Sequence, residues 1–130
     1  TNPDRTVVLI SGDGAFLSGG LSIEAAFQEN LPIVVVIDNN GGLDCISQQQ
    51  ERLFSSGKHF ATDFRDIPFH GLFKGLGGYG ELVTHRDDIS AAVKRAIASG
   101  KPACVNVKAR GVISPIVAAT SDKRDKASIE

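Results

Sequence analysis

The chain has 130 residues, of which 42% are hydrophobic and 22% are charged, and its formal net charge is -1. This composition indicates one folded domain and excludes an intrinsically disordered protein. The near-neutral charge gives no reason to expect a nucleic acid or a membrane as partner, and the longest apolar run, residues 33–37, is too short to span a bilayer.

The two cysteines and the absence of methionine indicate where the protein is located and whether the chain is complete. Cys45 and Cys104 form no paired motif, which is typical of buried free thiols in a reducing compartment, so we expect the cytoplasm. The chain begins with Thr1 and contains no methionine. Because a complete translation product starts with Met, we expect this chain to be a piece of a longer polypeptide.

The first third of the chain predicts two strands, a glycine-rich loop and a helix. Residues 6–10 are rich in β-branched side chains, which favours a strand covered on both faces. A loop over 11–20 leads to a helix over 21–30 that we expect to be largely buried. Residues 33–38 form a second apolar strand, and the Asn-Asn-Gly-Gly stretch at 39–42 ends it in a loop.

The middle of the chain has weaker patterns. Residues 47–54 favour a helix, and the Ser-Ser-Gly-Lys stretch at 55–58 breaks it in what we expect to be a mobile excursion. A short helix is predicted over 67–76, with its apolar residues on one face. A strand follows over 81–84.

The last helix has the clearest pattern. Apolar residues recur at helical spacing over 89–97, Asp87 is placed as N-cap, and Gly100 is placed as the C′ residue after the helix. Residues 103–107 form another apolar strand. This sequence of elements ends in a charged segment.

Strands and helices alternate along the chain, and the strands are apolar throughout. This pattern predicts an α/β fold, a three-layer, doubly wound and mostly parallel sheet over residues 1–118, with a charged C-terminal tail at 119–130. Ligands of such folds bind beyond the carboxyl ends of the strands. The polar loops at 11–20 and 38–42 both leave strands at that edge, so we expect them to be neighbours.

Three ligand classes compete for the first loop. A phosphate-binding P-loop requires a Lys that does not follow here, and a dinucleotide fingerprint fits Gly12 and Gly14 but meets Leu17 at its third glycine. The carboxylate of Asp13 would repel a bare phosphate. It would instead hold a divalent cation that in turn holds phosphate.

The second loop supports a cation. Asn40 offers a carboxamide oxygen, and the backbone carbonyl of Gly42 offers another ligand. Mg²⁺ takes about six oxygens and usually obtains only a few from protein, the rest coming from phosphate and water. The backbone N–H groups of Gly14, Ala15 and Phe16 can donate to the phosphate oxygens.

A plainer interpretation applies to the same residues. Asp13 and Asn40 are also typical turn residues, whose side chains accept hydrogen bonds from nearby backbone N–H groups. The histidines, His59, His70 and His85, are scattered without a partner at useful spacing. We expect them to have structural or surface roles.

The two loops carry a resemblance to a known family. Gly-Asp-Gly at 12–14, followed after 25 residues by Asn40 at the end of an Asn-Asn pair, resembles the motif of the thiamine diphosphate enzymes. Residues 24–42, 77–83 and 96–107 are similar to the last half of the diphosphate-binding domain in the acetolactate synthase and 2-hydroxyacyl-CoA lyase branch. The resemblance covers nearly the whole chain.

This resemblance implies thiamine diphosphate and Mg²⁺ as cofactors. The metal ligands it implies are the side chains of Asp13 and Asn40 and the carbonyl of Gly42. The cofactor-binding residues it implies are Gly12, Asp13, Gly14, Ala15, Phe16, Asn40, Gly42 and Leu43. Ala15 stands where many relatives have a serine that touches the diphosphate, which leaves only its N–H group for that contact.

The resemblance also implies what the chain does. It is expected to be the C-terminal, cofactor-binding segment of a lyase, decarboxylase or carboligase acting on 2-keto acids or 2-hydroxyacyl-CoA. The glutamate that activates the cofactor lies in another domain of such enzymes, so we expect no catalytic residue here and an inactive isolated chain. Its partners would be missing N-terminal domains or another subunit of a homo-oligomer. The alternative is a non-catalytic folded remnant or an interaction module.

Overall fold

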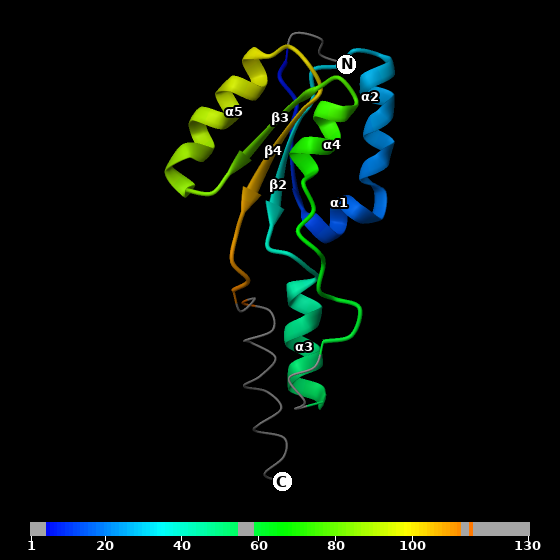
Figure 1. Cartoon of the computed structure of the whole chain (residues 1–130), viewed down its shortest axis with the longest axis vertical. Coiled ribbons are helices and arrows are strands. Elements are labelled where there is room, and N and C mark those ends of the chain that lie inside the picture. The colour runs from blue at the N-terminus through cyan, green and yellow to red at the C-terminus, as the bar shows by residue number, and fades with distance from the viewer. Residues whose placement is uncertain (1–4, 55–58, 113–114, 116–130) are drawn as a thin grey trace.

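The computed structural model of the chain describes residues 5–54, 59–112 and 115. Strands and helices alternate from one end of the described chain to the other (Figure 1). In chain order the elements are β1 (Val8–Gly12), α1 (Asp13–Gly19), η1 (Gly20–Ile23), α2 (Glu24–Gln28), β2 (Val34–Asn39), α3 (Asp44–Phe54), α4 (Phe69–Gly75), β3 (Tyr79–Val83), η2 (Arg86–Asp88), α5 (Ile89–Ala98) and β4 (Ala103–Lys108). The labels η1 and η2 denote 3₁₀ turns.

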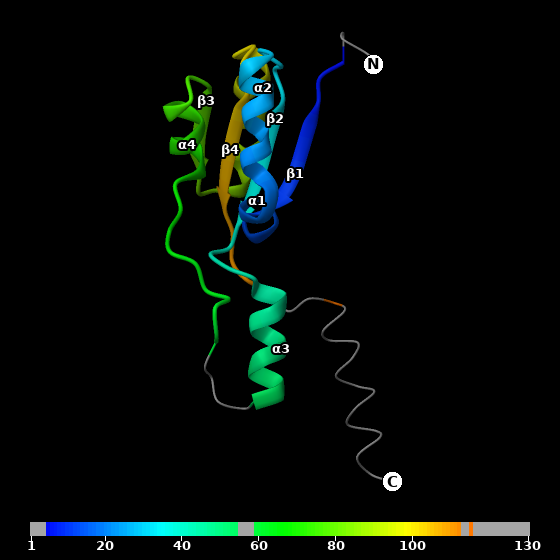
Figure 2. The ribbon, with the colours of Figure 1, turned by 90° about the vertical axis from the view of Figure 1, so that its right-hand side faces the viewer.

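The four strands form one parallel sheet in the order β1-β2-β4-β3. Helices α1, α2 and α4 lie on one face and α5 lies on the other, so the fold has three layers (Figures 1 and 2). This confirms the predicted α/β class with its parallel sheet. None of the helices among the described residues is long and apolar enough to cross a membrane.

The core on the α1–α4 face is built from aromatic rings. Phe16 of α1 meets Phe69 of α4 edge to face, with ring centroids 5.6 Å apart, and also contacts Phe73. These rings pack against Val35 and Ile37 of β2. Burial of the apolar surface of these rings is the main force that holds α1 and α4 against the sheet.

The core on the α5 face is built from small residues. Ala92 and Ala96 of α5 are fully buried against Val34 of β2 and Val105 of β4. Alanines separated by one helical turn let the helix lie close to the strands. Gly100 follows α5 with φ +63°, the left-handed conformation that the predicted C′ position requires.

The prediction that the first strand is covered on both faces was wrong. On the face that α5 packs against, Val8 and Ile10 of β1 are 43% and 76% exposed, and on the opposite face Leu9 is 48% exposed. Strand β1 lies at the sheet edge and pairs only with β2 among the described residues, while α5 packs over β2, β4 and β3. One helix about 10 Å wide covers only a few strands spaced about 4.8 Å apart, so β1 stays uncovered on that side.

Two predictions about the segment 11–30 were also wrong. The expected loop contains helix α1, which starts at Asp13 directly after β1. The Asp13 carboxylate accepts the Gly14 N–H at 2.7 Å and so satisfies a donor of the first turn. The expected buried helix over 21–30 is divided into η1 and α2, in which Ala26 is the buried residue and Leu21 is 71% exposed.

The start of the last helix also differs from its prediction. A 3₁₀ turn, η2, precedes α5, so Asp87 lies inside this turn and does not cap the helix. The Asp88 N–H reaches the His85 carbonyl at 3.1 Å, and this backbone bond replaces the expected side-chain cap. The helix predicted over 67–76 forms as the shorter α4, in which Phe69 and Phe73 are buried as predicted, whereas Leu72 and Leu76 of the same predicted apolar face are exposed.

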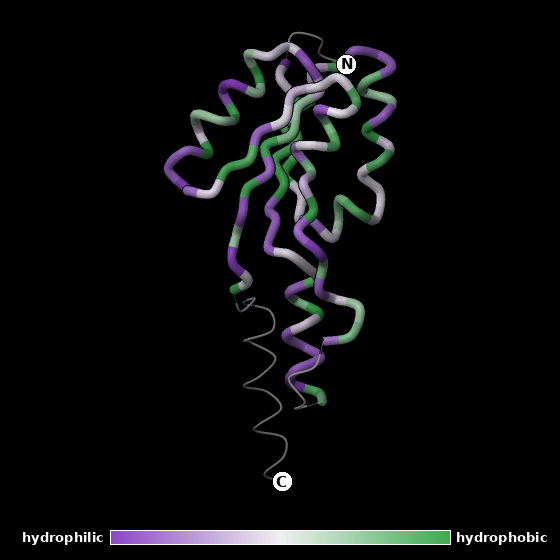
Figure 3. The backbone as a smooth tube through the Cα atoms, viewed as in Figure 1, coloured by the Kyte–Doolittle hydropathy of each residue, from purple (hydrophilic) through white to green (hydrophobic). Residues whose placement is uncertain are grey.

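Helix α3 projects away from the sheet (Figures 1 and 2). It begins at Asp44, three residues earlier than the predicted 47, and carries many hydrophilic residues (Figure 3). Cys45 on this helix is exposed, against expectation, whereas Cys104 in the sheet is buried and the pKa of its thiol is raised to about 12 by burial. The predicted break at 55–58 and the predicted tail at 119–130 lie outside the described residues.

Candidate functional site

The Asp13 carboxylate joins the two predicted loops. Its Oδ2 accepts the Gly41 N–H at 2.8 Å and the Gly42 N–H at 3.0 Å, and its Oδ1 accepts the Gly14 N–H at 2.7 Å. Asp13 is only 3% exposed. The two loops are therefore neighbours at the carboxyl edge of the sheet, as expected, and Asp13 also plays the backbone-capping part of the plainer interpretation.

Asn40 has a different environment from Asp13. Its Oδ1 is buried and has no hydrogen-bond partner in the described structure. A buried oxygen acceptor without a donor is uncommon in folded proteins and costs free energy unless something else occupies its lone pairs. An oxygen that neighbouring backbone does not use is available to a cation.

Gly42 lies in a turn that backbone hydrogen bonds hold beside the pocket. The turn is clamped by two hydrogen bonds, from the Leu43 N–H to the Thr62 carbonyl at 2.7 Å and from the Phe64 N–H to the Gly41 carbonyl at 2.8 Å. These bonds use backbone groups of the residues on either side of Gly42, and neither of them uses the Gly42 carbonyl. Gly41 has φ +85°, which favours glycine, so the turn depends on that residue type.

A pocket of about 420 Å³ opens between the two loops. All the predicted cofactor-binding residues except Phe16 line this pocket. The full lining is Gly12, Asp13, Gly14, Ala15, Asp38, Asn40, Gly42, Leu43, Asp44, Cys45, Ile46, Arg110, Val112 and Pro115. The structure thus brings residues from opposite ends of the chain around the predicted site.

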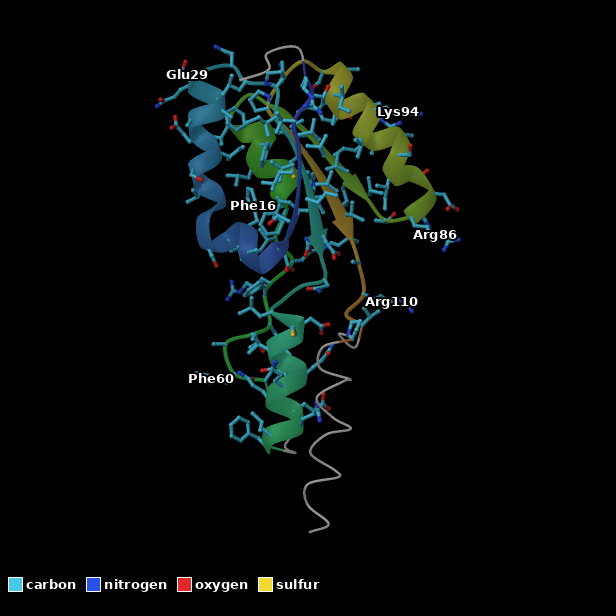
Figure 4. The ribbon with its side chains drawn as sticks, turned by 180° about the vertical axis from the view of Figure 1, so that it is seen from behind. Phe16, Glu29, Phe60, Arg86, Lys94 and Arg110 are labelled. Carbon is cyan, nitrogen blue, oxygen red and sulfur yellow. The ribbon has the colours of Figure 1, made fainter. Side chains whose placement is uncertain are left out.

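Phe16 stands apart from the other predicted residues. Its side chain is buried in the aromatic core, between α1 and the sheet (Figure 4). Helix α1 begins at Asp13, so the Phe16 N–H is bonded within the helix, and the prediction that it donates to a phosphate is wrong. The Gly14 N–H donates to Oδ1 of Asp13, which leaves the N–H of Ala15 as the free donor of the three predicted ones. The Phe16 ring instead holds α1 against α4.

The donors at this site suit Mg²⁺. Among the described residues there is no group of three or more His, Cys, Asp or Glu side chains that could hold a metal. Asp13, Asn40 and Gly42 offer one carboxylate, one carboxamide and one carbonyl oxygen, and Mg²⁺ usually takes a few such oxygens together with phosphate and water. Gly12 also lines the pocket, and a Cβ built there would have no atom within 4 Å, so there is open space beside this residue.

Some polar residues of the pocket were missed by the sequence analysis. Asp38 and Asp44 flank the Asn-Gly turn, and Arg110 follows the end of β4. In Figure 4, Arg110 lies where the chain leaves β4, near the start of α3. The signal that could have found Arg110 is its place just beyond a predicted strand, at the edge where parallel sheets bind ligands.

A buried polar chain beside the site was also missed. Asn39 donates from Nδ2 to Oδ1 of Asn106 at 3.1 Å, and Nδ2 of Asn106 lies 3.3 Å from Nδ1 of His70. Burial, followed by the charge of Lys74, lowers the pKa of His70 below its ordinary value. His70 does not line the pocket, and it is connected to the site through its hydrogen bond with Asn106, which in turn is bonded to Asn39.

The other two histidines lie away from these hydrogen-bonded side chains. His59 pairs with Asp63 at 3.1 Å, and His85 is exposed before η2. Neither of them lines the pocket. The structure does not bring the three histidines together.

The family follows from comparison with known proteins. The family model described as "Thiamine pyrophosphate enzyme, C-terminal TPP binding domain" matches residues 1–107. The chain belongs to this family. The predicted resemblance is therefore confirmed, including its acetolactate synthase and 2-hydroxyacyl-CoA lyase branch.

Several relatives of this TPP-binding domain are similar over most of the chain. A probable acetolactate synthase of Mycobacterium bovis is 38% identical over 106 residues, which is 81% of this chain and 19% of the relative. A 2-hydroxyacyl-CoA lyase of Arabidopsis thaliana is 30% identical over 126 residues, 94% of this chain and 21% of the relative.

A solved structure gives the same assignment. The thiamine diphosphate-dependent 4-hydroxybenzoylformate decarboxylase of Rhodococcus jostii RHA1 superposes with a TM-score of 0.73 at 29% identity, covering 87% of this chain and 21% of that protein. The chain spans about a fifth of the length of these relatives. It corresponds to their TPP-binding part.

Proposed function

We propose that this chain holds the diphosphate of thiamine diphosphate through Mg²⁺. The side chains of Asp13 and Asn40 and the Gly42 carbonyl bind the metal, and the N–H group of Ala15 in the first turn of α1 donates to the phosphate oxygens. The observation that carries this proposal is the buried Asn40 Oδ1, which has no partner in the described structure and belongs to a residue that lines the same pocket as Asp13.

The charges explain why a metal is needed. Asp13, Asp38 and Asp44 line the pocket together with Arg110, so a diphosphate entering alone would meet three carboxylates and one guanidinium. A divalent cation bound between Asp13 and the phosphates converts this repulsion into attraction.

The same proposal extends to the complete enzyme. Thiamine diphosphate, when bound, supplies the carbon nucleophile and the electron sink for making or breaking C–C bonds next to a carbonyl. This chain binds and orients it within a cytoplasmic lyase, decarboxylase or carboligase for 2-keto acids or 2-hydroxyacyl-CoA, with further domains of the same polypeptide or another subunit of a homo-oligomer as partners. The names of the relatives support this range of activities.

Asn40→Ala is the sharpest test, because Oδ1 of Asn40 has no hydrogen bond to lose. We expect the affinity for thiamine diphosphate with Mg²⁺ to fall at least about tenfold, the effect of losing one charge-assisted contact, while the melting temperature stays unchanged. Calorimetric titration of the full chain measures the affinity. Gln49→Ala on the exposed side of α3 is the control, and an Asn40→Ala variant with wild-type affinity would contradict the proposal.

Asp13→Ala is expected to behave differently. It removes a proposed metal ligand and also the acceptor of three backbone N–H groups. We therefore expect binding of Mg²⁺ and thiamine diphosphate to be lost, together with about 1–3 kcal/mol of stability or more. Titration and chemical denaturation measure the two effects, and full retention of binding would oppose a role for Asp13 in the site.

A second candidate function is a non-catalytic interaction module. The observation that favours it is the exposed apolar surface of β1. Under this alternative, the wild-type chain shows no heat of binding with Mg²⁺ and thiamine diphosphate at any concentration tested. Saturable binding by the wild-type chain supports the cofactor-anchoring function instead.

A further inference from the structure

The point at which β2 ends and the metal-binding turn begins is held by a line of buried amides. Asn39, the last residue of β2, is 2% exposed, and Asn106 of β4 is 1% exposed. The Asn39 carbonyl accepts the Ala109 N–H at 3.0 Å, and its side chain donates to Asn106. The next residue along the chain is Asn40, so these contacts set where the turn starts.

The direction of each hydrogen bond in this line follows from its first acceptor. The Ile67 carbonyl can only accept, so Nδ2 of Asn39 must face it, at 3.4 Å. The same Nδ2 then donates to Oδ1 of Asn106 at 3.1 Å, which turns Nδ2 of Asn106 towards Nδ1 of His70 at 3.3 Å. Since Asn106 donates here, Nδ1 of His70 must be an unprotonated acceptor, and its proton lies on Nε2.

Protonation of His70 would break this pattern. The imidazolium has a donor on each ring nitrogen, so Nδ1–H would face the Nδ2 donor of Asn106. To avoid this, Asn106 would have to turn its amide, which would bring its own Nδ2 against the Asn39 donor. The rotation of the Asn106 amide would therefore break its hydrogen bond with Asn39, the residue directly before the turn.

The charges around His70 favour the neutral form. Burial contributes most to lowering its pKa below 6.5, followed by Lys74 on the same helix, and Lys108 on β4 acts in the same direction. Asp66 in the segment before α4 acts in the opposite direction and pairs with Lys108. On the β3 side, uncharged Gly80 lies against the backbone of His70.

We propose that Asn39, Asn106 and neutral His70 form a hydrogen-bonded relay that positions the residue 40–42 turn, and that protonation of His70 at Nδ1 displaces this turn. The three are positioning residues, since none of them lines the pocket. The inference that this tunes Mg²⁺ binding rests on the proposed function, whereas the link between His70 and the turn does not.

The link is tested directly by ¹H–¹⁵N NMR of the full chain, titrated from about pH 7.5 to about pH 5. The amides of Gly41 and Gly42 report on the turn, because both donate to Asp13. In the wild type we expect their resonances to shift with the same midpoint as the His70 ring, below 6.5. No metal or cofactor is needed for this measurement.

Two variants separate the relay from general effects of pH. His70→Asn places a carboxamide oxygen close to the position of Nδ1, which preserves an acceptor for Asn106 and removes the titration. We expect it to abolish the pH-dependent shift of Gly41 and Gly42. His85→Asn, at an exposed histidine outside the relay, is the matched control and should leave the shift intact.

Asn106→Ala tests the middle of the relay. His70 still titrates in this variant, but the Gly41 and Gly42 resonances should no longer follow it. The proposal is overturned if these two amides follow pH identically in the wild type and in His70→Asn, or if Asn106→Ala leaves their coupling to His70 intact. Either result would show that the turn does not sense His70.

The functional consequence has its own measurement, with Mg²⁺ and inorganic pyrophosphate as probe. Between pH 7.5 and 5.5 we expect the wild-type affinity to fall about fivefold to tenfold more than that of His70→Asn, the effect of one buried hydrogen bond. Equal pH dependence would overturn the tuning of binding by His70. Failure of the wild type to bind at any pH would overturn the proposed function, while the NMR titration would still decide the relay.

Discussion

Gly80 lies where β3 passes closest to α4. A Cβ built at this position would overlap the backbone carbonyl of His70, which cannot move as a side chain can. The absence of a side chain at Gly80 thus lets α4 approach the sheet and carry His70 towards Asn106. Because Gly80 carries a hydrogen atom where other residues carry Cβ, α4 can lie this close to β3.

We expect Gly80→Ala to lower the free energy of unfolding by about 1–3 kcal/mol, because the added methyl must push the backbone of α4 away. Gly71→Ala, in α4, is the matched control. Its Cβ would lie 3.6 Å from Pro68, an ordinary contact, and alanine favours the helix by up to about 1 kcal/mol. Urea denaturation of both variants measures the difference, and equal stabilities would contradict this account of the α4–β3 contact.

At the scale of elements, a polar clamp ties β3 to α5. Arg95 of α5 donates from Nε to Oε2 of Glu81 at 3.1 Å, and Tyr79 donates to the same oxygen at 2.5 Å. The hydrogen bond from Arg95 lowers the pKa of the Glu81 carboxyl, and the hydrogen bond to Glu81 raises the pKa of Tyr79. The clamp lies at the protein surface, where water and salt weaken it.

The expected contribution of this clamp is small. Arg95→Gln should lower the free energy of unfolding at pH 7 only slightly, because an ion pair in contact with water contributes little to stability. Because the Glu81 pKa is lowered in the folded state, this contribution is present above its ordinary value of 4.5 and is lost as the pH falls through the folded value. Lys94→Gln, one residue earlier, is the control in denaturant titrations at pH 7 and pH 3, and a loss at pH 3 as large as at pH 7 would refute the pH dependence.

At the scale of the whole molecule, the sheet is covered unevenly. Helices lie on both faces of β2, β4 and β3, while β1 exposes Val8, Leu9 and Ile10 at the sheet edge. Contiguous apolar surface beside unpaired strand backbone favours association with another chain or segment. The chain spans about a fifth of its relatives, and we expect this edge to be an interface.

We therefore expect the chain to self-associate as its concentration rises. Ile10→Lys places a charge on the exposed edge strand and should shift this association to concentrations at least about tenfold higher. Leu21→Lys is a matched control, because Leu21 is 71% exposed, close to the 76% of Ile10, but lies on η1 outside the sheet. Sedimentation velocity measures both, and an equal effect of the two variants would argue against the β1 edge as the interface.

Local patterns predicted much of this protein. Apolar runs predicted the strands, and their parallel arrangement brought the turns at Asp13 and Asn40 together because strands of one direction end at one edge. The spacing of these turns also predicted the family. Such features depend on residues close in the sequence, or on a rule of sheet topology, so they can be inferred without coordinates.

Only the tertiary structure decided which surfaces are covered and which polar groups meet. The exposure of β1 depends on how many strands α5 can cover, and the relay of Asn39, Asn106 and His70 joins residues up to 67 positions apart. No periodicity encodes such contacts, because they arise from packing between elements. The sequence alone therefore placed the acid and the amide of the candidate metal site, and the fold decided what holds them in position.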